Sequence, residues 1–334
     1  MNILVTGGAG YIGSHTLIEL LNTGHEVCVI DNLSNSSIKT ISSVELITGK
    51  KIKFYKVDLL NISELDKIFK DEKIDYVIHF AGLKSVSESF EIPFEYYRIN
   101  VQASIVLFEL MLKYKVRNIV FSSSATVYGD PLSFPITESF ELSPINPYGR
   151  TKFIVEEILR DMYKSGLFYR VSILRYFNPL GAHSSGLIGE NLDNQPNNLM
   201  PVIARVFLGK QKTLKIFGNN YETIDGTALR DYIHVQDLAN AHLKAIEFSQ
   251  DSARIITLNV GTGHPHSVME VIESFENASG VKIKTEICDR RLGDAEKSYT
   301  SVKEINNLLS WKPKRDLNQM CFDTVNWLKT QKQV

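Results

Sequence analysis

The sequence predicts an α/β protein built on a doubly wound parallel sheet, with a smaller, interleaved α/β domain in its C-terminal part. Two observations lead to this class. A glycine-rich segment at residues 6–13 lies between a short apolar run and a helical pattern, and apolar runs then alternate with helical patterns up to residue 174. Such alternation is typical of a parallel sheet covered by helices on both faces. We therefore expect a Rossmann fold.

The composition is that of an ordinary globular protein and argues against several partners. The 334 residues carry a net charge of −1, so no basic excess is present to neutralise a nucleic acid. Residues 1–6 lead into the glycine-rich segment without a basic or long apolar leader, and no run of about 18 apolar residues suggests a membrane span. The three cysteines lack metal-binding spacing, so we expect free thiols in a cytoplasmic protein and no metal site.

The first strand, expected at residues 3–5, leads into the sequence TGGAGYIG. Glycines here allow a tight turn, let the backbone approach a pyrophosphate and expose the N-terminus of the next helix to it. That helix is indicated by apolar residues at helical spacing, with Gly24 just past its end as a cap. The dinucleotide pattern fits in two registers, with Gly8, Gly10 and Gly13 or with Gly7, Gly10 and Gly13.

A second strand at residues 26–30 ends at Asp31, about twenty residues after the glycines. A carboxylate there binds a ribose 2′-hydroxyl and repels a 2′-phosphate, and no basic residue follows before Lys39. This pattern favours NAD over NADP. The alternative is that Asp31 caps a turn with Asn32 and Ser34, as short polar side chains do.

Two further strands are expected at residues 53–57 and 76–80. Asp58 follows the first and is a natural contact for an adenine amino group, and Ser63 is expected to cap a helix that ends near residue 71. After the second strand, Lys84 lies either near the nucleotide phosphates or in a solvated loop.

A long helix is expected at residues 94–114, where the polar Asn100 interrupts an apolar pattern. Buried polar side chains are hydrogen-bonded, so this position predicts a buried hydrogen-bonding role. The apolar faces of this helix and of the one after Tyr148 are broad enough to pair with symmetry mates, which indicates a homodimer.

The chemistry is expected at the carboxyl end of a buried strand at residues 116–121. Three serines follow this strand, where open α/β sheets place their ligands. A helix at 148–164 carries Tyr148 and Lys152 four residues apart, so both side chains lie on one face. The charge of Lys152 would favour the phenolate of Tyr148 and draw its pKa from about 10 toward neutrality, as a general base requires. Ser124 would donate or relay a hydrogen bond to the same substrate hydroxyl.

The alternative for Tyr148 and Lys152 is an exposed helical pair of little consequence. Tyr299 and Lys303 have the same spacing, but no nucleotide-binding strand or serine cluster precedes them. We therefore interpret the second pair as incidental and the first as catalytic.

The chain changes character beyond residue 177. Gly, Asn and Ser are dense at 181–198, as in loops that cover a ligand, and a strand at 258–261 is expected to return to the main sheet. The domains therefore interleave. We predict a cofactor domain at 1–177 plus 233–262 and a substrate domain at 178–232 plus 263–334.

A series of motifs also resembles a known family. They are TGGAGYIG (6–13), HFAG (79–82), SSSATVYG (122–129), PYGRTK (147–152), RYFNP (175–179), NNLMP (197–201), RDYIHV (230–235) and RRLGD (290–294). In order and spacing they are similar to the extended short-chain dehydrogenase/reductase superfamily, and the last three narrow the resemblance to UDP-glucose 4-epimerases. The match extends from residue 1 to residue 327.

The resemblance implies an isomerase that interconverts UDP-galactose and UDP-glucose with resident NAD. Tyr148 would remove the proton of the sugar 4-hydroxyl while a hydride passes from C4 to NAD. The resulting 4-keto sugar would turn about its pyrophosphate link, and the hydride would return to its other face. Lys152 would hold the nicotinamide ribose and lower the pKa of Tyr148, while Ser124 would hydrogen-bond the reacting oxygen. Such a redox-neutral cycle uses NAD as a resident catalyst.

The resemblance also assigns binding residues. The predicted cofactor contacts are Gly7, Gly10, Tyr11, Ile12, Gly13, Asp31, Asn32, Asp58, Leu59, Phe80, Ala81, Gly82, Lys84, Ser124, Tyr148, Lys152 and Phe177. The predicted UDP-sugar contacts are Ser124, Asn178, Asn198, Leu199, Ile216, Phe217, Arg230, Tyr232, Arg291, Asp294 and Ser298. The two arginines suit this site because guanidinium forks match phosphate oxygens, although a surface ion pair is the alternative for either.

Two positions depart from the best-known bacterial pattern of the family. Ile99 stands where an Asn often contacts the cofactor, which removes that one contact. Ser298 stands where glucose-restricted members carry a bulky Tyr against the sugar C2 substituent. A small residue there leaves room for an N-acetyl group, so we expect interconversion of UDP-GlcNAc and UDP-GalNAc as well.

Three alternatives compete with this interpretation. A glucose-only epimerase would share every motif and differ in the sugar pocket. A nucleotide-sugar 4,6-dehydratase needs an acid and a base directly after the active-site hydroxyl residue, and here Ala125 and Thr126 occupy those places. A non-catalytic NAD-sensing regulator would be expected to lack the Tyr/Lys pair or the sugar-site arginines.

Overall fold

The computed structural model describes residues 1–192, 198–248, 253–291 and 295–331, and its main feature is a seven-stranded sheet. The strands are β1 (Asn2–Thr6), β2 (Glu26–Ile30), β3 (Lys53–Tyr55), β4 (Tyr76–His79), β5 (Asn118–Ser124), β6 (Arg170–Tyr176) and β10 (Arg254–Val260). They lie in the order β10-β6-β5-β4-β1-β2-β3, and the pairs from β3 to β6 are parallel. The predicted doubly wound parallel sheet is confirmed, and the strand that includes residues 258–260 joins its edge.

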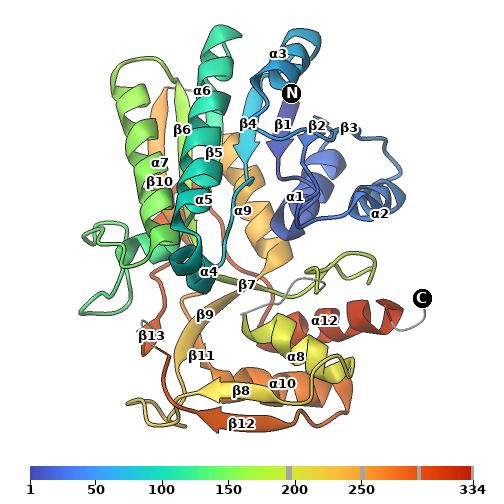
Figure 1. Cartoon of the computed structure of the whole chain (residues 1–334), viewed down its shortest axis with the longest axis vertical. Coiled ribbons are helices and arrows are strands. Elements are labelled where there is room, and N and C mark those ends of the chain that lie inside the picture. The colour runs from blue at the N-terminus through green and yellow to red at the C-terminus, as the bar shows by residue number, and fades with distance from the viewer. Residues whose placement is uncertain (193–197, 249–252, 292–294, 332–334) are drawn as a thin grey trace. The chain divides into compact units, whose positions relative to one another are not determined.

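Helices cover both faces of this sheet (Figure 1). The helices of this part of the chain are α1 (Tyr11–Asn22), α2 (Ile38–Thr48), α3 (Ile62–Asp71), α4 (Val86–Glu91), α5 (Pro93–Tyr96), α6 (Ala103–Lys113), α7 (Pro147–Lys164) and α9 (Val235–Phe248), of which α4 and α5 are short. Right-handed connections place α1 and α2 on one face and α3, α6 and α7 on the other. Asn240 of α9 donates to Glu19 of α1 over 2.9 Å, so α9 shares the face of α1.

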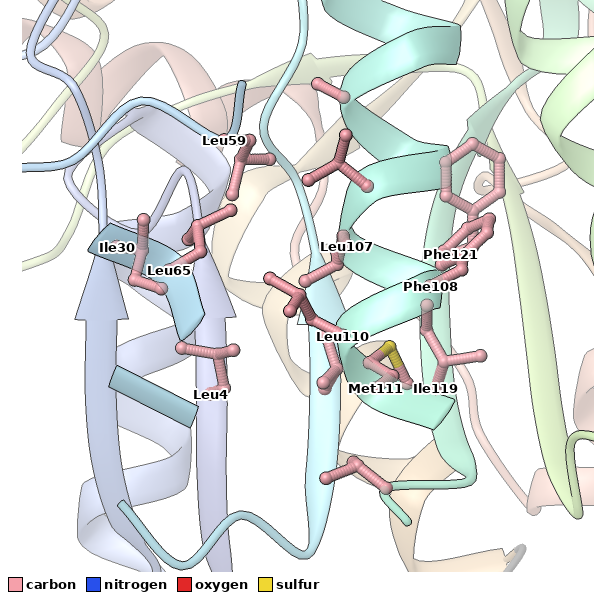
Figure 2. Packing of buried hydrophobic residues seen from close by; sticks show 14 of the residues in the cluster. Leu4, Ile30, Leu59, Leu65, Leu107, Phe108, Leu110, Met111, Ile119 and Phe121 are labelled. Atoms are coloured by element: carbon pink, nitrogen blue, oxygen red, sulfur yellow. The ribbon is translucent and has the colours of Figure 1, made fainter. Parts of the chain in front are cut away.

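One hydrophobic core cluster lies between the sheet and helices α3, α6 and α7. Leu107, Phe108 and Met111 are at most 2% exposed, and their spacing places them on the inner face of α6. Figure 2 shows Met111 beside Ile119 of β5. Alternate strand residues point into this cluster, as the two-residue period of a strand requires. This packing fixes the positions of the strands, and the chemistry is expected at their carboxyl ends.

Two local predictions differ from the structure. Ser63 does not cap α3, because Asn61 stands at the N-cap and its Oδ1 accepts the backbone N–H of Glu64 over 3.3 Å. The helix expected at 94–114 is divided into α5, the π-helical turn η1 (Tyr97–Gln102) and α6. Asn100 lies within η1, and π-helical turns are frequent at functional sites.

The chain divides into two compact units. Unit 1 comprises Met1–Asp130, Glu138–Tyr176 and Ala239–Leu258, and unit 2 comprises Pro131–Thr137, Phe177–Leu238 and Asn259–Val334. The strands of unit 2 are β7 (Asn178–Leu180), β8 (Leu214–Phe217), β9 (Leu229–His234), β11 (Pro265–Ser267), β12 (Thr285–Cys288) and β13 (Lys297–Ser298). Its helices are α8 (Leu199–Phe207), α10 (Val268–Ser279), α11 (Lys303–Leu309) and α12 (Leu317–Gln331).

Cys28 and Cys321 are buried and Cys288 is half-buried, and all are free thiols, as predicted. In the part of the chain that the structure describes, no helix combines the length and the apolar character needed to cross a bilayer.

The core of unit 1 yields a stability prediction. We expect Leu107→Ala to lower the free energy of unfolding by about 2–5 kcal/mol, because the fully buried side chain would leave a cavity. Urea denaturation followed by circular dichroism would measure the change. Leu46→Ala on α2 is the matched control, since Leu46 is 73% exposed and should change the free energy by less than about 0.5 kcal/mol. Equal effects of the two substitutions would contradict this assignment of the core.

Candidate active site

The structure brings Ser124, Tyr148 and Lys152 together at the carboxyl end of β5. Ser124 is the last residue of β5, and the other two lie on α7. Helix α7 begins there because Pro147 occupies its first turn and Asn146 caps it, with the side-chain oxygen accepting the N–H of Gly149 over 2.8 Å. All three catalytic candidates are buried, so few waters compete with their mutual interactions.

Lys152 is held at the end of the sheet by one hydrogen bond and by an aromatic ring. Its Nζ donates to the carbonyl oxygen of Ser122 over 2.9 Å and lies 5.0 Å from the ring centroid of Phe121. Burial lowers the pKa of Lys152 to about 8, while the negative charge of Glu156 raises it. At neutral pH the side chain is therefore a buried ammonium group.

The expected shift of the Tyr148 pKa is wrong for the protein in this structure. Burial raises the pKa of Tyr148 to about 12, and only the hydrogen bond with Ser124 lowers it. Lys152 lies 6.0 Å from the centre of the Tyr148 ring and its ammonium is directed to a carbonyl oxygen. The phenolate therefore loses more from the removal of water than it gains from the nearby positive charge.

Ser124 begins a 3-10 turn, η2 (Ala125–Tyr128), and its hydroxyl lies at the centre of a small network. Its Oγ accepts the backbone N–H of Thr126 over 3.2 Å and the Thr126 hydroxyl over 3.0 Å. Because these two donors occupy the acceptor positions of Ser124, its own proton is directed elsewhere, and its hydrogen bond lowers the pKa of Tyr148.

The glycine-rich turn lies between the ends of β1 and β4. Gly7 has a φ of +70°, and a Cβ there would meet the backbone nitrogen of Ala81 at 2.7 Å. Gly10 caps α1 without a side-chain hydrogen bond, and a Cβ there would meet only the carbonyl oxygen of Gly7 within 4 Å. The N-terminus of α1, which has no side-chain cap, fits the pyrophosphate of a dinucleotide. Tyr11 and Ile12 open α1 beside it.

Asp31 joins the glycine-rich turn to the end of β2. Its Oδ2 accepts the N–H of Ala9 over 3.0 Å, and its Oδ1 accepts the N–H of Leu33 over 2.9 Å. The turn-capping role considered as the alternative is therefore present, together with a contact to the glycine-rich turn. Asp58 is exposed, and its Oδ2 accepts a hydrogen bond from the side-chain amide of Asn32 over 2.8 Å. This bond links the loop after β2 to the loop after β3. Leu59 beside Asp58 is buried.

Further predicted cofactor contacts follow β4 in the sequence. Phe80 is half-buried with its ring centroid 4.8 Å from that of His242, and Lys84 is exposed. A Cβ on Gly82 would meet the Oδ1 of Asn100 at 2.9 Å. The amide of Asn100 accepts from the N–H of Leu83 over 2.7 Å and donates to the Leu83 carbonyl over 3.0 Å, so its buried hydrogen-bonding role is confirmed. Ile99 lies half-buried in the same π-helical turn.

The predicted UDP-sugar residues in unit 2 form two groups. In the first, Ser298 of β13 lies opposite Arg230 of β9 in the parallel pairing. In the second, the guanidinium carbon of Arg291 lies 4.4 Å from the ring centroid of Phe217, whose neighbour Ile216 is buried.

The remaining predicted residues that the structure describes lie on or next to β7, β9 and α8. Asn178 begins β7 opposite the buried Tyr232, and Phe177 precedes it with its N–H bound to the Val260 carbonyl. Asn198 caps α8 and Leu199 is its first residue. Asp294 lies outside the described residues.

Residues 134–136, which the sequence analysis did not predict to be near the site, contact the residues that follow Ser298. The ring of Phe134 stacks on that of Tyr299 with centroids 5.3 Å apart. Ile136 bridges to Thr300, and its N–H donates to the Tyr299 carbonyl over 2.9 Å. Tyr299 is thus a packing residue next to Ser298, and it lies before α11 instead of sharing a helical face with Lys303.

Sequence reasoning also missed two groups near Tyr148 and Lys152. Tyr176 is half-buried at the end of β6, and a hydrogen bond joins it to Ser122. Glu156 is fully buried one turn after Lys152. The signal was present in the sequence, since Tyr148, Lys152 and Glu156 follow one another at intervals of four residues on one face of α7.

Comparison with known proteins gives the family. Residues 3–261 match the model of the NAD dependent epimerase/dehydratase family. A UDP-glucose 4-epimerase of Bacillus subtilis (strain 168) is 51% identical over 327 residues, which cover 98% of this chain and 96% of that protein. Two solved UDP-glucose 4-epimerases align along almost the whole of both chains. The Stenotrophomonas maltophila enzyme, with bound NAD and formylated UDP-arabinopyranose, has a TM-score of 0.97, 45% identity and coverage of 100% and 99%. The Bifidobacterium longum enzyme, in complex with NAD+ and UDP, has a TM-score of 0.96, 44% identity and coverage of 99% and 99%.

The chain therefore belongs to the NAD dependent epimerase/dehydratase family, within the extended short-chain dehydrogenase/reductase superfamily, and groups there with the UDP-glucose 4-epimerases. This confirms the resemblance found in the sequence. It also confirms that the protein is an enzyme with NAD as its cofactor, in agreement with the glycine-rich turn at the N-terminus of α1.

The packing of the glycine-rich turn yields a prediction on cofactor retention. We expect Gly13→Ala to lose bound NAD, because a Cβ at this helical position would lie 2.4 Å from the carbonyl oxygen of Gly7 and displace the turn. The NAD released on denaturation, measured per mole of purified protein, reports the effect. Tyr148→Phe is the control, since it should keep NAD but lose activity by about 10²–10⁴-fold. A Gly13→Ala protein that retains as much NAD as the wild type would contradict the prediction.

Proposed function

We propose that this enzyme interconverts UDP-galactose and UDP-glucose through a 4-keto intermediate, with NAD resident in unit 1. One observation carries the proposal, namely the burial of Ser124, Tyr148 and Lys152 together at the carboxyl end of β5. A phenol, an ammonium and a hydroxyl that are shielded from water can together transfer the proton of a secondary alcohol. When bound, NAD supplies the acceptor and donor of the hydride.

The roles of the three residues follow from their contacts. Tyr148 exchanges the proton of the sugar 4-hydroxyl. Its raised pKa means that the phenol is protonated at neutral pH, which suits the return of a proton to a sugar oxygen. To take the proton of the 4-hydroxyl, Tyr148 must first lose its own proton, and a nearby positive charge stabilises the resulting phenolate. Lys152 supplies that charge and hydrogen-bonds the nicotinamide ribose. Ser124 donates to the reacting oxygen, since its acceptor positions are occupied by Thr126.

The cofactor contacts are proposed as predicted from the sequence. The N-terminus of α1 at Gly10 holds the pyrophosphate, and Asp31 accepts from the adenosine ribose. Asp58 is exposed and accepts from the adenine amino group. The carboxylate of Asp31 disfavours a 2′-phosphate, which supports NAD over NADP.

The UDP-sugar contacts are proposed to lie in unit 2. Arg230 and Arg291 bind the diphosphate oxygens, and the register of Ser298 opposite Arg230 supports placing Ser298 at the sugar end of the same ligand. Phe217 offers an apolar ring on β8, and the contact of Arg291 with this ring supports a shared role. Ile216 is retained as a proposed contact beside it. We retain Asn178, Asn198, Leu199, Tyr232 and Asp294 as further contacts.

We further propose that the enzyme also interconverts UDP-GlcNAc and UDP-GalNAc. A tyrosine at position 298 would fill the space beside the sugar C2 atom, whereas the serine present here leaves that space open. The half-buried Ser298 lies on a strand that Phe134 and Ile136 hold through Tyr299 and Thr300. A rigid, small-residue wall is what a pocket for an N-acetyl group requires.

The domain roles, the oligomeric state and the location are proposed together. The NAD-binding domain comprises 1–177 plus 233–262, and the UDP-sugar-binding domain comprises 178–232 plus 263–334. The protein acts in the cytoplasm as a homodimer. The apolar side chains of Phe94 on α5 and Ile105 on α6 support the dimer, because they are 83% and 39% exposed in the single chain.

A direct assay tests the function. Purified protein is incubated with UDP-galactose and with UDP-GalNAc, without added cofactor, and the epimers are resolved by chromatography. Conversion of both supports resident NAD and the wide pocket. Conversion of UDP-galactose alone would support the glucose-only epimerase and contradict the wide pocket. If neither substrate is converted even after NAD is added, the proposed function is wrong.

The pocket argument makes a separate prediction at position 298. We expect Ser298→Tyr to lose activity on UDP-GalNAc and to keep it on UDP-galactose, because the ring would occupy the space of the N-acetyl group. The ratio of kcat/KM for the two substrates measures the effect. Ser298→Ala, which keeps the residue small, should retain both activities. If Ser298→Tyr keeps the wild-type ratio, this residue does not control the size of the pocket.

A further inference from the structure

A buried ion pair lies directly behind the proposed catalytic residues. Glu156 of α7 has no exposed surface, and Arg175 of β6 is 2% exposed. The Arg175 Nη2 donates to Glu156 Oε2 over 2.5 Å, and the Nε donates to Oε1 over 2.9 Å, so the pair is bidentate. The proposed reaction assigns no step to either group.

The same carboxylate binds the strand that ends at the active site. The hydroxyl of Ser123 donates to Glu156 Oε1 over 2.5 Å. Ser123 lies between Ser122, whose carbonyl accepts from Lys152, and Ser124, which hydrogen-bonds Tyr148. Glu156 is therefore one hydrogen bond away from the backbone that orients both catalytic partners.

Arg175 extends this network to the turn that follows Ser124. Its Nη1 donates to the hydroxyl of Tyr128 over 2.9 Å, and Tyr128 is the last residue of η2. The network thus joins α7, β5, β6 and η2, which are the elements that carry or flank Ser124, Tyr148 and Lys152. Apolar residues packed between these elements could hold them at similar stability, since a buried ion pair repays little more than its own desolvation. The main contribution of the Glu156–Arg175 pair is therefore to fix the relative positions of these elements.

We propose that Glu156 is a positioning residue of the epimerase, which fixes the end of β5 relative to Lys152 and provides the negative charge that Lys152 faces. The proposal rests on the proposed function, because it concerns the residues that carry the reaction. Displacement of catalytic groups by about 1 Å can reduce a rate 10²-fold. Because the Glu156 carboxylate connects α7 to β5 and β6, its loss should lower the rate of the reaction.

The charge of Glu156 has a consequence for pH dependence. Around Lys152 lie the Ser122 carbonyl, the rings of Phe121 and Tyr148, and His79, whose pKa burial lowers to about 3 and which is therefore neutral. Glu156 is the charged group that raises the pKa of Lys152. Arg175 and Arg160 face Glu156 itself, at 2.5 and 3.4 Å.

The direction of the effect follows from the active form of Lys152. The ammonium form is active, so activity falls as the pH rises through the pKa of Lys152. Loss of the Glu156 charge lowers that pKa, and the alkaline fall in kcat should therefore move to lower pH.

Glu156→Gln in the NAD-loaded enzyme tests the proposal. We expect kcat for UDP-galactose to fall by about 10²-fold with little change in KM, because positioning and not substrate binding is lost. The alkaline limb of kcat should move to lower pH, while the NAD content per mole of protein stays at the wild-type value. Glu157→Gln is the matched control, since the Glu157 side chain is 51% exposed and bound to Arg160 over 3.3 Å; it should behave as the wild type.

Two milder variants decide the question if Glu156→Gln fails to fold. Ser123→Ala removes the bond from the strand to the carboxylate, and Tyr128→Phe removes the acceptor of Arg175. Each should lower kcat and leave the alkaline limb in place, because the charge of Glu156 remains. Folded Ser123→Ala and Tyr128→Phe enzymes with the wild-type kcat would overturn the positioning role, as would a folded Glu156→Gln enzyme with the wild-type kcat and alkaline limb. Inactivity of the wild type on UDP-galactose would instead reject the proposed function.

Discussion

The hydrogen bond from the Lys152 ammonium to the Ser122 carbonyl is the interaction on which the site depends. It places a positive charge inside the protein at the end of a parallel strand, where water cannot solvate it. The surroundings are arranged accordingly. The carboxylate of Glu156 lies one turn further along α7, and the ring of Phe121 presents its face to the charge. Ser124 and Tyr148 then meet beside the ammonium instead of facing solvent.

The sheet provides this place through its strand order. From β1 the chain proceeds to β2 on one side, and β4 later pairs with the other side of β1. The carboxyl ends of β1 and β4 therefore diverge into different loops, which opens the crevice in which doubly wound sheets bind ligands. Gly7 meets the backbone of Ala81 at this point, and no side chain fits between them.

Buried polar side chains near this crevice form a chain of hydrogen bonds between the ends of neighbouring strands. His79 lies between the Thr6 hydroxyl at 2.7 Å and the Ser104 hydroxyl at 2.9 Å, and burial keeps it neutral by lowering its pKa to about 3. Ser104 in turn donates to the carbonyl of Asn100 over 2.5 Å. This chain of hydrogen bonds connects β1, β4 and the π-helical turn, so the backbone around the crevice is held by specific bonds as well as by apolar packing.

The sequence by itself determined the parallel sheet, the glycine-rich turn and the grouping of Ser124, Tyr148 and Lys152, because periodicity and short-range spacing encode them. It could not give the direction of the Tyr148 pKa shift, since that depends on how much water the folded core excludes. The cap of α3 at Asn61 and the π-helical turn at Asn100 depend on small changes in backbone path that propensity does not resolve. Only the tertiary structure decided that Glu156 meets Arg175 and that Phe134 stacks on Tyr299, because those partners lie far apart in the chain and no local pattern pairs them.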